Sequence, residues 1–89
     1  MNLFKKKNRK IKVEIYSKDD CHLCDEAKAV LLKVHDEFPF EFSEKDITRD
    51  KKIFAEFKEQ IPIVFINGRK AFKFRVDEGD FRRKLKRLL

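Results

Sequence analysis

The chain has 89 residues and a formal net charge of +7, and its residues are 42% hydrophobic and 44% charged. A chain of this length buries a single core, which excludes a second large domain. No apolar stretch approaches the roughly 20 residues that span a bilayer, and the first ten residues lack the apolar segment of a signal peptide. We therefore expect a cytoplasmic protein that binds no membrane.

Charge is distributed unevenly along the chain. Residues 1–13 hold six basic side chains and no acidic one, residues 82–87 hold five basic side chains, and all sixteen acids lie between Glu14 and Asp80. We interpret residues 1–10 as a solvated basic arm and residues 11–89 as one folded domain. Basic ends can attract a phosphate backbone or an acidic partner, but few aromatics accompany the N-terminal bases, which disfavours nucleic acid.

The first half of the chain alternates between strand and helix patterns. Residues 11–17 place apolar side chains at every second position, which predicts a strand with one buried face. Apolar side chains then recur three or four positions apart over residues 23–38, which predicts an amphipathic helix that ends before Pro39. Residues 40–47 alternate again at their start, which predicts a second, short strand.

A second helix and a central strand are predicted next. Thr48 or Asp50 can cap a helix over residues 51–60, whose buried side would hold Ile53, Phe54 and Phe57. Residues 61–66 are a continuous apolar run of strand length, which predicts a central strand. Pro62 is compatible with that strand because a missing N–H donor is tolerated at a strand start.

The last segment combines a hairpin with a helix. Asn67–Gly68 predicts a type I′ turn, which needs positive φ at both residues, followed by a returning strand over residues 69–76. Asp77 would begin the final helix, and Asp80 adds negative charge near its N-terminus. The apolar stripe of that helix would consist of Phe81, Leu85, Leu88 and Leu89.

These elements give the order β-α-β-α-β-β-α, typical of an α/β domain. The first two strands are joined through a helix and should run parallel by a right-handed crossover. The last two strands should form an antiparallel hairpin, so the predicted sheet is four-stranded and mixed, with helices flanking it.

The two cysteines of the chain, Cys21 and Cys24, follow the first predicted strand and open the first predicted helix. Their C-x-x-C spacing puts both thiols on one turn, close enough to form a disulfide. Unpaired N–H groups at a helix N-terminus stabilise a thiolate, which favours Cys21 as nucleophile and the more shielded Cys24 as resolving thiol. Lys18 and a protonated His22 also favour the thiolate, whereas the neighbouring acids oppose it.

A metal site and an inert buried pair are the alternatives. A structural zinc needs four ligands, and this pair supplies two. His35 lies about 16 Å further along the helix at 1.5 Å per residue, and His22 should point away from the thiols. Only a dimer that shares two such motifs could complete a zinc or iron–sulfur site, so we expect no metal in the single chain. Polar neighbours argue against an inert core pair.

The stretch IYSKDDCHLC, residues 15–24, and the stretch IPIVFING, residues 61–68, resemble the glutaredoxin-like proteins of the thioredoxin superfamily. The resemblance extends from about residue 11 to residue 89 and implies a thioredoxin-like fold. It implies that Cys21 attacks a substrate disulfide and that Cys24 resolves the mixed disulfide. It also implies a cis peptide at Ile61–Pro62, which faces the dithiol and pairs with bound substrate.

The same resemblance suggests where glutathione would bind, and this chain departs from the family pattern there. Lys18 matches a lysine that meets a glutathione carboxylate, and Asp77 could receive the glutathione amine. However, His22 and Leu23 replace the usual Pro-Tyr, which implies a more oxidising couple. Phe72 and Phe74 stand near the usual Gly-Gly and would fill space that glycines leave open.

Our leading hypothesis is a thiol-disulfide oxidoreductase that exchanges or reduces disulfides through Cys21 and Cys24 without a permanently bound cofactor. Its substrates would be disulfide-bearing proteins or small thiols. Glutathione is a candidate co-substrate, and a reductant of the thioredoxin-reductase type is the other electron source. The competing hypotheses are a binding module recruited by its basic termini to nucleic acid or an acidic partner, and a dimer that bridges an iron–sulfur cluster.

Overall fold

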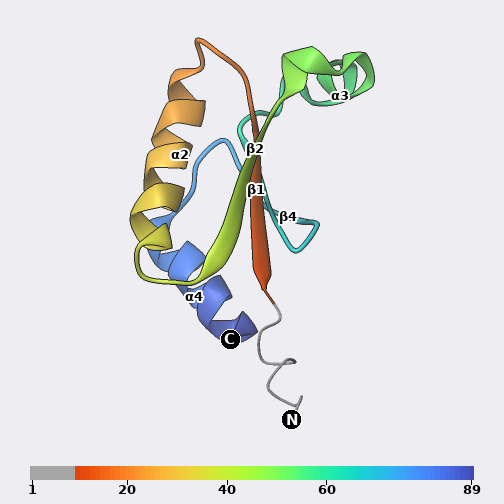
Figure 1. Cartoon of the computed structure of the whole chain (residues 1–89). Coiled ribbons are helices and arrows are strands. Elements are labelled where there is room, and N and C mark those ends of the chain that lie inside the picture. Colours follow the sequence, from red (N-terminus) through yellow and green to blue (C-terminus); the bar gives the residue numbers. More distant parts are fainter. Residues whose placement is uncertain (1–9) are drawn as a thin grey trace.

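The computed structural model describes residues 10–89 (Figure 1). In chain order the elements are β1 (Ile11–Ser17), α2 (His22–His35), β2 (Phe40–Asp46), the short 3-10 helix η1 (Ile47–Arg49), α3 (Lys51–Phe57), β3 (Ile63–Ile66), β4 (Arg69–Lys73) and α4 (Glu78–Leu88). Apart from η1, this is the order β-α-β-α-β-β-α that the sequence predicts.

The strands form one mixed sheet in the order β2-β1-β3-β4. β1 and β2 are parallel over seven residue pairs, from Ile11 opposite Phe40 to Ser17 opposite Asp46. β3 is antiparallel to both β1 and β4. The predicted parallel pair, the predicted hairpin and the interior place of β3 are all confirmed.

The hairpin turn between β3 and β4 has the predicted type. Asn67 has a φ of 51° and Gly68 a φ of 83°, so both central residues are left-handed, as a type I′ turn requires. The register shifts between Val64, which faces Phe72, and Phe65, which faces Lys70. Ala71 is the extra residue, and such a bulge bends the edge strand.

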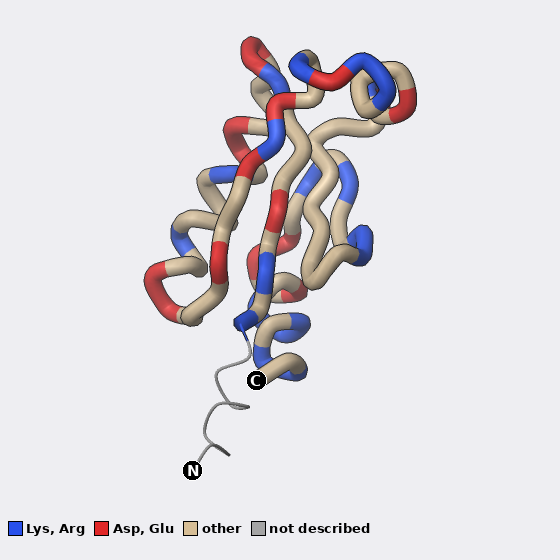
Figure 2. The backbone as a smooth tube through the Cα atoms, turned by 45° about the vertical axis from the view of Figure 1, so that its right-hand side comes forward, with Lys and Arg blue, Asp and Glu red and all other residues tan. Residues whose placement is uncertain are grey.

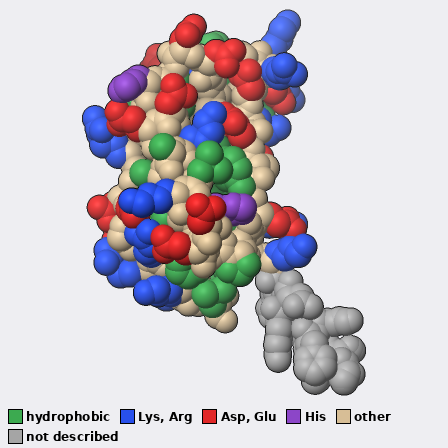
Figure 3. Space-filling model, turned by 60° about the vertical axis from the view of Figure 1, so that its left-hand side comes forward, with side chains coloured by type: hydrophobic (Ala, Val, Ile, Leu, Met, Phe, Trp, Pro, Cys, Tyr) green, Lys and Arg blue, Asp and Glu red, His purple; other side chains and the backbone are tan. Residues whose placement is uncertain are grey.

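Charged side chains cover much of the surface. Figure 2 shows Lys and Arg grouped at the end of the molecule where β1 begins and α4 ends. On the α2 side, acidic and basic side chains surround a small group of hydrophobic ones (Figure 3). Residues 1–9 of the predicted basic arm lie outside the described residues, and Lys10 lies 3.5 Å from a Glu41 carboxylate oxygen. Within residues 10–89, no helix combines the length and the apolar character needed to cross a membrane.

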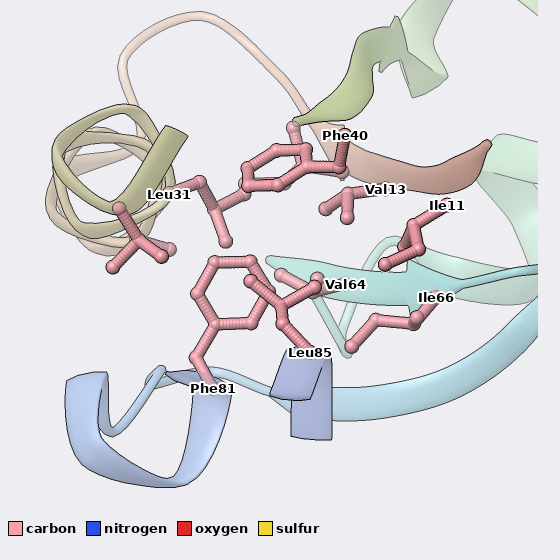
Figure 4. Packing of buried hydrophobic residues seen from close by; sticks show 11 residues of the cluster. Ile11, Val13, Leu31, Phe40, Val64, Ile66, Phe81 and Leu85 are labelled. Atoms are coloured by element: carbon pink, nitrogen blue, oxygen red, sulfur yellow. The ribbon is translucent and has the colours of Figure 1, made fainter. Parts of the chain in front are cut away.

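The main core fills the space between the sheet and the helices α2 and α4 (Figure 4). β1 contributes alternate residues to it, as its period predicts, and the two helices contribute residues spaced three or four apart. Its buried members are Ile11, Val13, Ile15, Ala27, Leu31, Val34, Phe40, Val64, Ile66, Phe81 and Leu85.

A smaller cluster lies next to α3. Tyr16, at one of the alternate positions of β1, has its ring 4.6 Å from that of Phe65 and 5.4 Å from that of Phe57. The buried members of this cluster are Cys24, Ile47 and Ile61, and the α3 residues packed against them are Ile53, Phe54 and Phe57. Asp50 caps α3 by accepting the backbone N–H groups of Lys52 and Ile53, which confirms one of the two predicted caps.

The structure corrects five element boundaries. α3 ends at Phe57 rather than at residue 60, and β3 begins at Ile63 rather than at residue 61. β2 has seven residues, so the prediction of a short strand is wrong. α2 ends at His35, before the turn that leads to Pro39. β4 ends at Lys73 rather than at residue 76, because Phe74 is left-handed with a φ of 70°, which ends the extended run.

The predicted apolar stripe of α4 is only half buried. Phe81 and Leu85 are fully buried, whereas Leu88 is 46% exposed and Leu89 is 71% exposed. The helical spacing of the stripe is correct, but its C-terminal end lies outside the core.

Candidate active site

Cys21 and Cys24 form a disulfide at the start of α2, with their Cα atoms 5.2 Å apart. Cys21 is the N-cap residue, with an extended backbone, and its carbonyl accepts the N–H of Asp25. Its Sγ accepts the backbone N–H of Cys24 at 3.1 Å. The first sulfur therefore lies where unpaired helix N–H groups are available to a thiolate.

The two sulfurs differ in their access to solvent. Cys21 is half-buried, whereas Cys24 is 1% exposed. Asp20, directly before Cys21, has a φ of 56°, a left-handed conformation that Asp tolerates better than most residues. This sharp turn brings the chain from β1 into α2. The structure thus confirms the predicted difference in shielding between the leading thiol and the second thiol.

The disulfide lies over the smaller hydrophobic cluster. Cys24 packs in it with Ile47 and Ile61, and the Ile61–Pro62 peptide bond is cis, as the resemblance implied. The Pro62 carbonyl accepts the backbone N–H of Phe74 at 2.7 Å. Segments far apart in sequence are therefore joined at the site: the start of α2, the start of β3 and the end of β4.

Tyr16 packs against this cluster from β1. Partial burial, and then the nearby Glu14 carboxylate, raise the pKa of the Tyr16 hydroxyl. The side chain is therefore neutral at physiological pH, and it packs, like Cys21, against the cluster of Cys24, Ile47 and Ile61.

His22 lies on the outer surface of α2, with its side chain 86% exposed. Its Nε2 is 2.8 Å from a carboxylate oxygen of Glu26, one turn further along α2. The other carboxylate oxygen of Glu26 is 3.6 Å from Nη1 of Arg75, which follows β4. This chain of charges connects the segment after β4 to the helix that carries the cysteines.

Lys18 and Asp77 have different surroundings. Lys18 is exposed, and within residues 10–89 no carboxylate lies within ion-pair distance of it. Asp77 is the N-cap of α4, and its Oδ2 accepts the backbone N–H of Asp80 at 2.8 Å. The predicted roles of Lys18 and Asp77 in binding glutathione, and of His22 beside the Cys21 thiolate and its substrate, stay predictions.

Sequence reasoning missed a polar network that joins β1, β2 and α2. Ser17, the last residue of β1, is buried, and its hydroxyl donates to a Glu44 carboxylate oxygen at 2.7 Å. The Lys28 ammonium donates to the same oxygen at 2.8 Å. The Lys28 bond, and then the Ser17 bond, hold the pKa of Glu44 below its usual value. The available signal was Ser17 itself, a polar residue at an inward position of an alternating strand.

Within the described residues, no three His, Cys, Asp or Glu side chains are grouped so that they could hold a metal ion. The chemistry available at the site is that of a helix-capping sulfur, a buried partner sulfur and an adjacent cis-proline. That combination supports thiol–disulfide exchange.

Comparisons with known proteins agree with this geometry. A family model described as "Glutaredoxin-like domain (DUF836)" matches residues 12–86. The chain is 32% identical over 76 residues to a Dictyostelium discoideum protein named "Glutaredoxin-like protein YDR286C homolog". The match covers 79% of this chain and 70% of that protein.

Solved structures share the fold. The X. campestris structural-genomics target XcR50 is 25% identical, with a TM-score of 0.70 over 84% of this chain and 96% of the other. Mitochondrial thioredoxin 3 from Saccharomyces cerevisiae, in its oxidised form, is 17% identical, with a TM-score of 0.66 over 96% of this chain and 89% of the other. The fold is therefore thioredoxin-like, and the chain belongs to the glutaredoxin-like (DUF836) domain family.

Proposed function

We propose that this protein is a thiol-disulfide oxidoreductase that works through Cys21 and Cys24. The observation that carries the proposal is the unequal pair at the start of α2: one half-buried cysteine whose sulfur caps the helix, and a second cysteine that is only 1% exposed. The leading sulfur can meet a substrate in solution, and the second sulfur can reach only the first.

The reductive half-reaction begins with both cysteines reduced. The Cys21 thiolate attacks one sulfur of the substrate disulfide, the substrate S–S bond breaks, and the leaving thiolate takes a proton from solvent. The Cys24 thiol loses its proton and attacks the Cys21 sulfur. The mixed disulfide then breaks, the second substrate thiolate is released and protonated, and the Cys21–Cys24 disulfide forms. The substrate gains two electrons, and the protein loses two.

The backbone N–H of Cys24 donates to Cys21 Sγ. This hydrogen bond stabilises a thiolate at Cys21, because a hydrogen bond to the charged form of a group favours that form. Burial has the opposite effect on Cys24, since an apolar environment disfavours a thiolate. The two thiols are thus expected to differ in acidity, with Cys21 the stronger acid.

The protein needs an external reductant to complete a cycle. We propose glutathione or a reductase of the thioredoxin-reductase type as the electron source, a disulfide-bearing protein or small thiol as the substrate, and the cytoplasm as the compartment. Lys18 is the proposed contact for a glutathione carboxylate and Asp77 for the glutathione amine. The Asp77 carboxylate already caps α4, so only its second oxygen is available for that contact.

The test is a disulfide-reduction assay on the wild type, Cys21→Ser and Cys24→Ser. NADPH would supply electrons through glutathione and glutathione reductase in one series, and through thioredoxin reductase in another. Cys21→Ser should reduce turnover to the background rate. Cys24→Ser should accumulate a mixed disulfide on Cys21, visible by mass spectrometry. A wild type without turnover in both series, or an unimpaired Cys21→Ser variant, would refute the proposal.

A further inference from the structure

A second site lies at the opposite end of the molecule from the disulfide. The β3–β4 hairpin and the C-terminal half of α4 enclose an open hollow of about 620 Å³. Four cationic residues contribute to its lining: Arg69 and Lys70 from the hairpin, and Lys84 and Arg87 from α4. The Lys70 ammonium lies 5.3 Å from the centre of the Phe57 ring on α3, and the Lys84 ammonium 5.8 Å from the centre of the Phe72 ring.

The positive charge of this hollow is not neutralised within the described residues. No carboxylate from residues 10–89 lies within ion-pair distance of any of the four cations, and no acidic residue lines the hollow. In contrast, Arg82 and Arg83 on the same helix are paired with Glu37, Glu78 and Asp80. Unneutralised cations around one concave surface give a positive potential that attracts anions.

The hollow is close to the point where the chain enters β1. The backbone N–H of Asn67 donates to the Lys12 carbonyl at 2.8 Å, and the Lys12 N–H donates to the Asn67 side-chain oxygen at 2.9 Å. β1 runs from this end towards the disulfide, and its five-residue advance from Lys12 to Ser17 spans about 16 Å. A ligand in the hollow therefore leaves Cys21 free to react.

The floor of the hollow is apolar. Ile66 and Ala71 contribute to it from the hairpin, and Leu88, which is 46% exposed, contributes from α4. A nucleic-acid backbone has no apolar groups to cover such a floor. The hollow also has no aromatic lining on which bases could stack. An acidic peptide that contains leucine or a similar residue would place carboxylates on the cations and an apolar side chain on the floor.

We propose that this hollow is a docking site for an acidic, leucine-containing segment of a partner protein. The site is separate from the proposed redox chemistry. It would hold a partner at the protein while Cys21 reacts with a disulfide, and electrostatic attraction would speed the encounter.

The test uses the full chain and fluorescein-labelled 16-residue peptides, with binding measured by fluorescence anisotropy at low and physiological salt. One peptide is rich in Glu with interspersed Leu, and a second replaces each Leu by Ser. Single-stranded DNA and RNA 16-mers are the competing probes. The Glu/Leu peptide should bind most tightly, and its affinity should fall as salt rises.

Charge-reversal variants distinguish binding at this hollow from attraction to the net positive charge of the whole protein. The triple reversal R69E/K84E/R87E should weaken peptide binding about tenfold or more. The matched reversal K51E/K52E/K58E on α3, with the same change in net charge, should have little effect. Leu88→Ala should weaken binding of the Leu peptide a few-fold and leave binding of the Ser peptide unchanged. If circular dichroism shows that the triple variant is unfolded, Arg87→Ala replaces it and should still weaken binding more than Lys52→Ala.

Equal losses in the two triple variants would refute the site, and so would equal affinity for the Leu and Ser peptides. Tighter binding of either oligonucleotide than of the Glu/Leu peptide would refute the proposed partner class. Cys21→Ser should bind the peptide as the wild type does, so a failure of the redox proposal and a failure of this one are distinguishable.

Discussion

Ser17 shows how one buried polar side chain can connect several elements of the fold. It is the buried polar side chain among residues 10–89, and its hydroxyl donates to Glu44, which also accepts a bond from Lys28. A buried hydroxyl without a partner would be destabilising, so Ser17 needs the acceptor oxygen that Glu44 supplies, and the negative charge on Glu44 strengthens its bonds to Ser17 and Lys28. The network links β1 and β2 to α2, the helix that carries the cysteines.

The first prediction concerns the pH dependence of stability. The folded pKa of Glu44 is lowered by the bonds from Lys28 and Ser17. Its contribution is therefore present above the pKa that Glu44 has in the unfolded chain and is lost as pH falls through the lower, folded value. Urea denaturation of the wild type should show a loss of stability at acidic pH that is smaller in Glu44→Gln.

The control for this experiment is Glu41→Gln, on the same strand, whose carboxylate pairs with Lys10 at the surface. This variant should retain the acid sensitivity of the wild type. If Glu44→Gln and the wild type lose equal stability between neutral and acidic pH, the network does not contribute as described.

The structural roles of several single residues could be predicted directly from the sequence, because these roles depend only on neighbouring residues. Asn67–Gly68 forms the predicted turn since few other pairs adopt positive φ twice, and Asp50 and Asp77 cap helices as predicted. Cys21 and Cys24 belong to the same group because neighbouring residues on one helical turn meet whatever the tertiary structure. The Ser17–Glu44 contact joins residues 27 positions apart. No local rule predicts such a contact.

At the scale of elements, β2 explains the main error of the sequence-based prediction. Its hydrophobic alternation ends after Phe42, and the remaining residues, Ser43 to Asp46, are polar on both faces. The strand continues because its backbone pairs with β1 as far as Ser17 opposite Asp46. Hydropathy reports side-chain burial, whereas this extension depends on main-chain hydrogen bonds to a neighbouring strand.

The second prediction concerns the N-terminus of α4. Asp77→Ala removes the side-chain oxygen that accepts the Asp80 N–H and should lower the free energy of unfolding by about 1 kcal/mol. Asp77→Asn keeps an oxygen acceptor at that position and should be nearly as stable as the wild type. Thermal denaturation with circular dichroism measures both.

The same pair of variants tests whether Asp77 binds a substrate amine. If it does, Asp77→Asn should raise the KM for glutathione at nearly unchanged stability, because the charge is lost while the cap is kept. An unchanged KM in Asp77→Asn would restrict Asp77 to its structural role, and a marked loss of stability in that variant would contradict the account of the cap.

At the scale of the whole molecule, the core consists of two apolar regions with different surroundings. The larger one, under α2 and α4, holds most of the buried surface. The smaller one, with Ile47 and Ile61, surrounds the buried Cys24. The sequence indicates the larger region through its periodic patterns. Of the smaller one it indicates only the apolar side of α3, because the buried members Cys24, Ile47 and Ile61 come from separate segments that meet only in the folded chain.

The third prediction uses two helical leucines that differ in burial. Leu85, on α4, is fully buried, whereas Leu32, on α2, is 47% exposed. Leu85→Ala should lower the free energy of unfolding by about 2–5 kcal/mol, through lost burial and the cavity left behind. Leu32→Ala should change it by less than about 0.5 kcal/mol. Urea denaturation at neutral pH measures both, and similar losses in the two variants would contradict the placement of the core.

The strand order β2-β1-β3-β4 leaves β2 and β4 at the outer margins of the sheet. An edge strand has unpaired backbone groups, so another chain can add a strand to it, and ordered aggregates start to grow in this way. Both edge strands carry many charged side chains: β2 has Glu41, Glu44, Lys45 and Asp46, and β4 has Arg69, Lys70 and Lys73. Any strand that joined them would have to dehydrate these groups, so the high charge content of this sequence also protects its sheet against intermolecular growth.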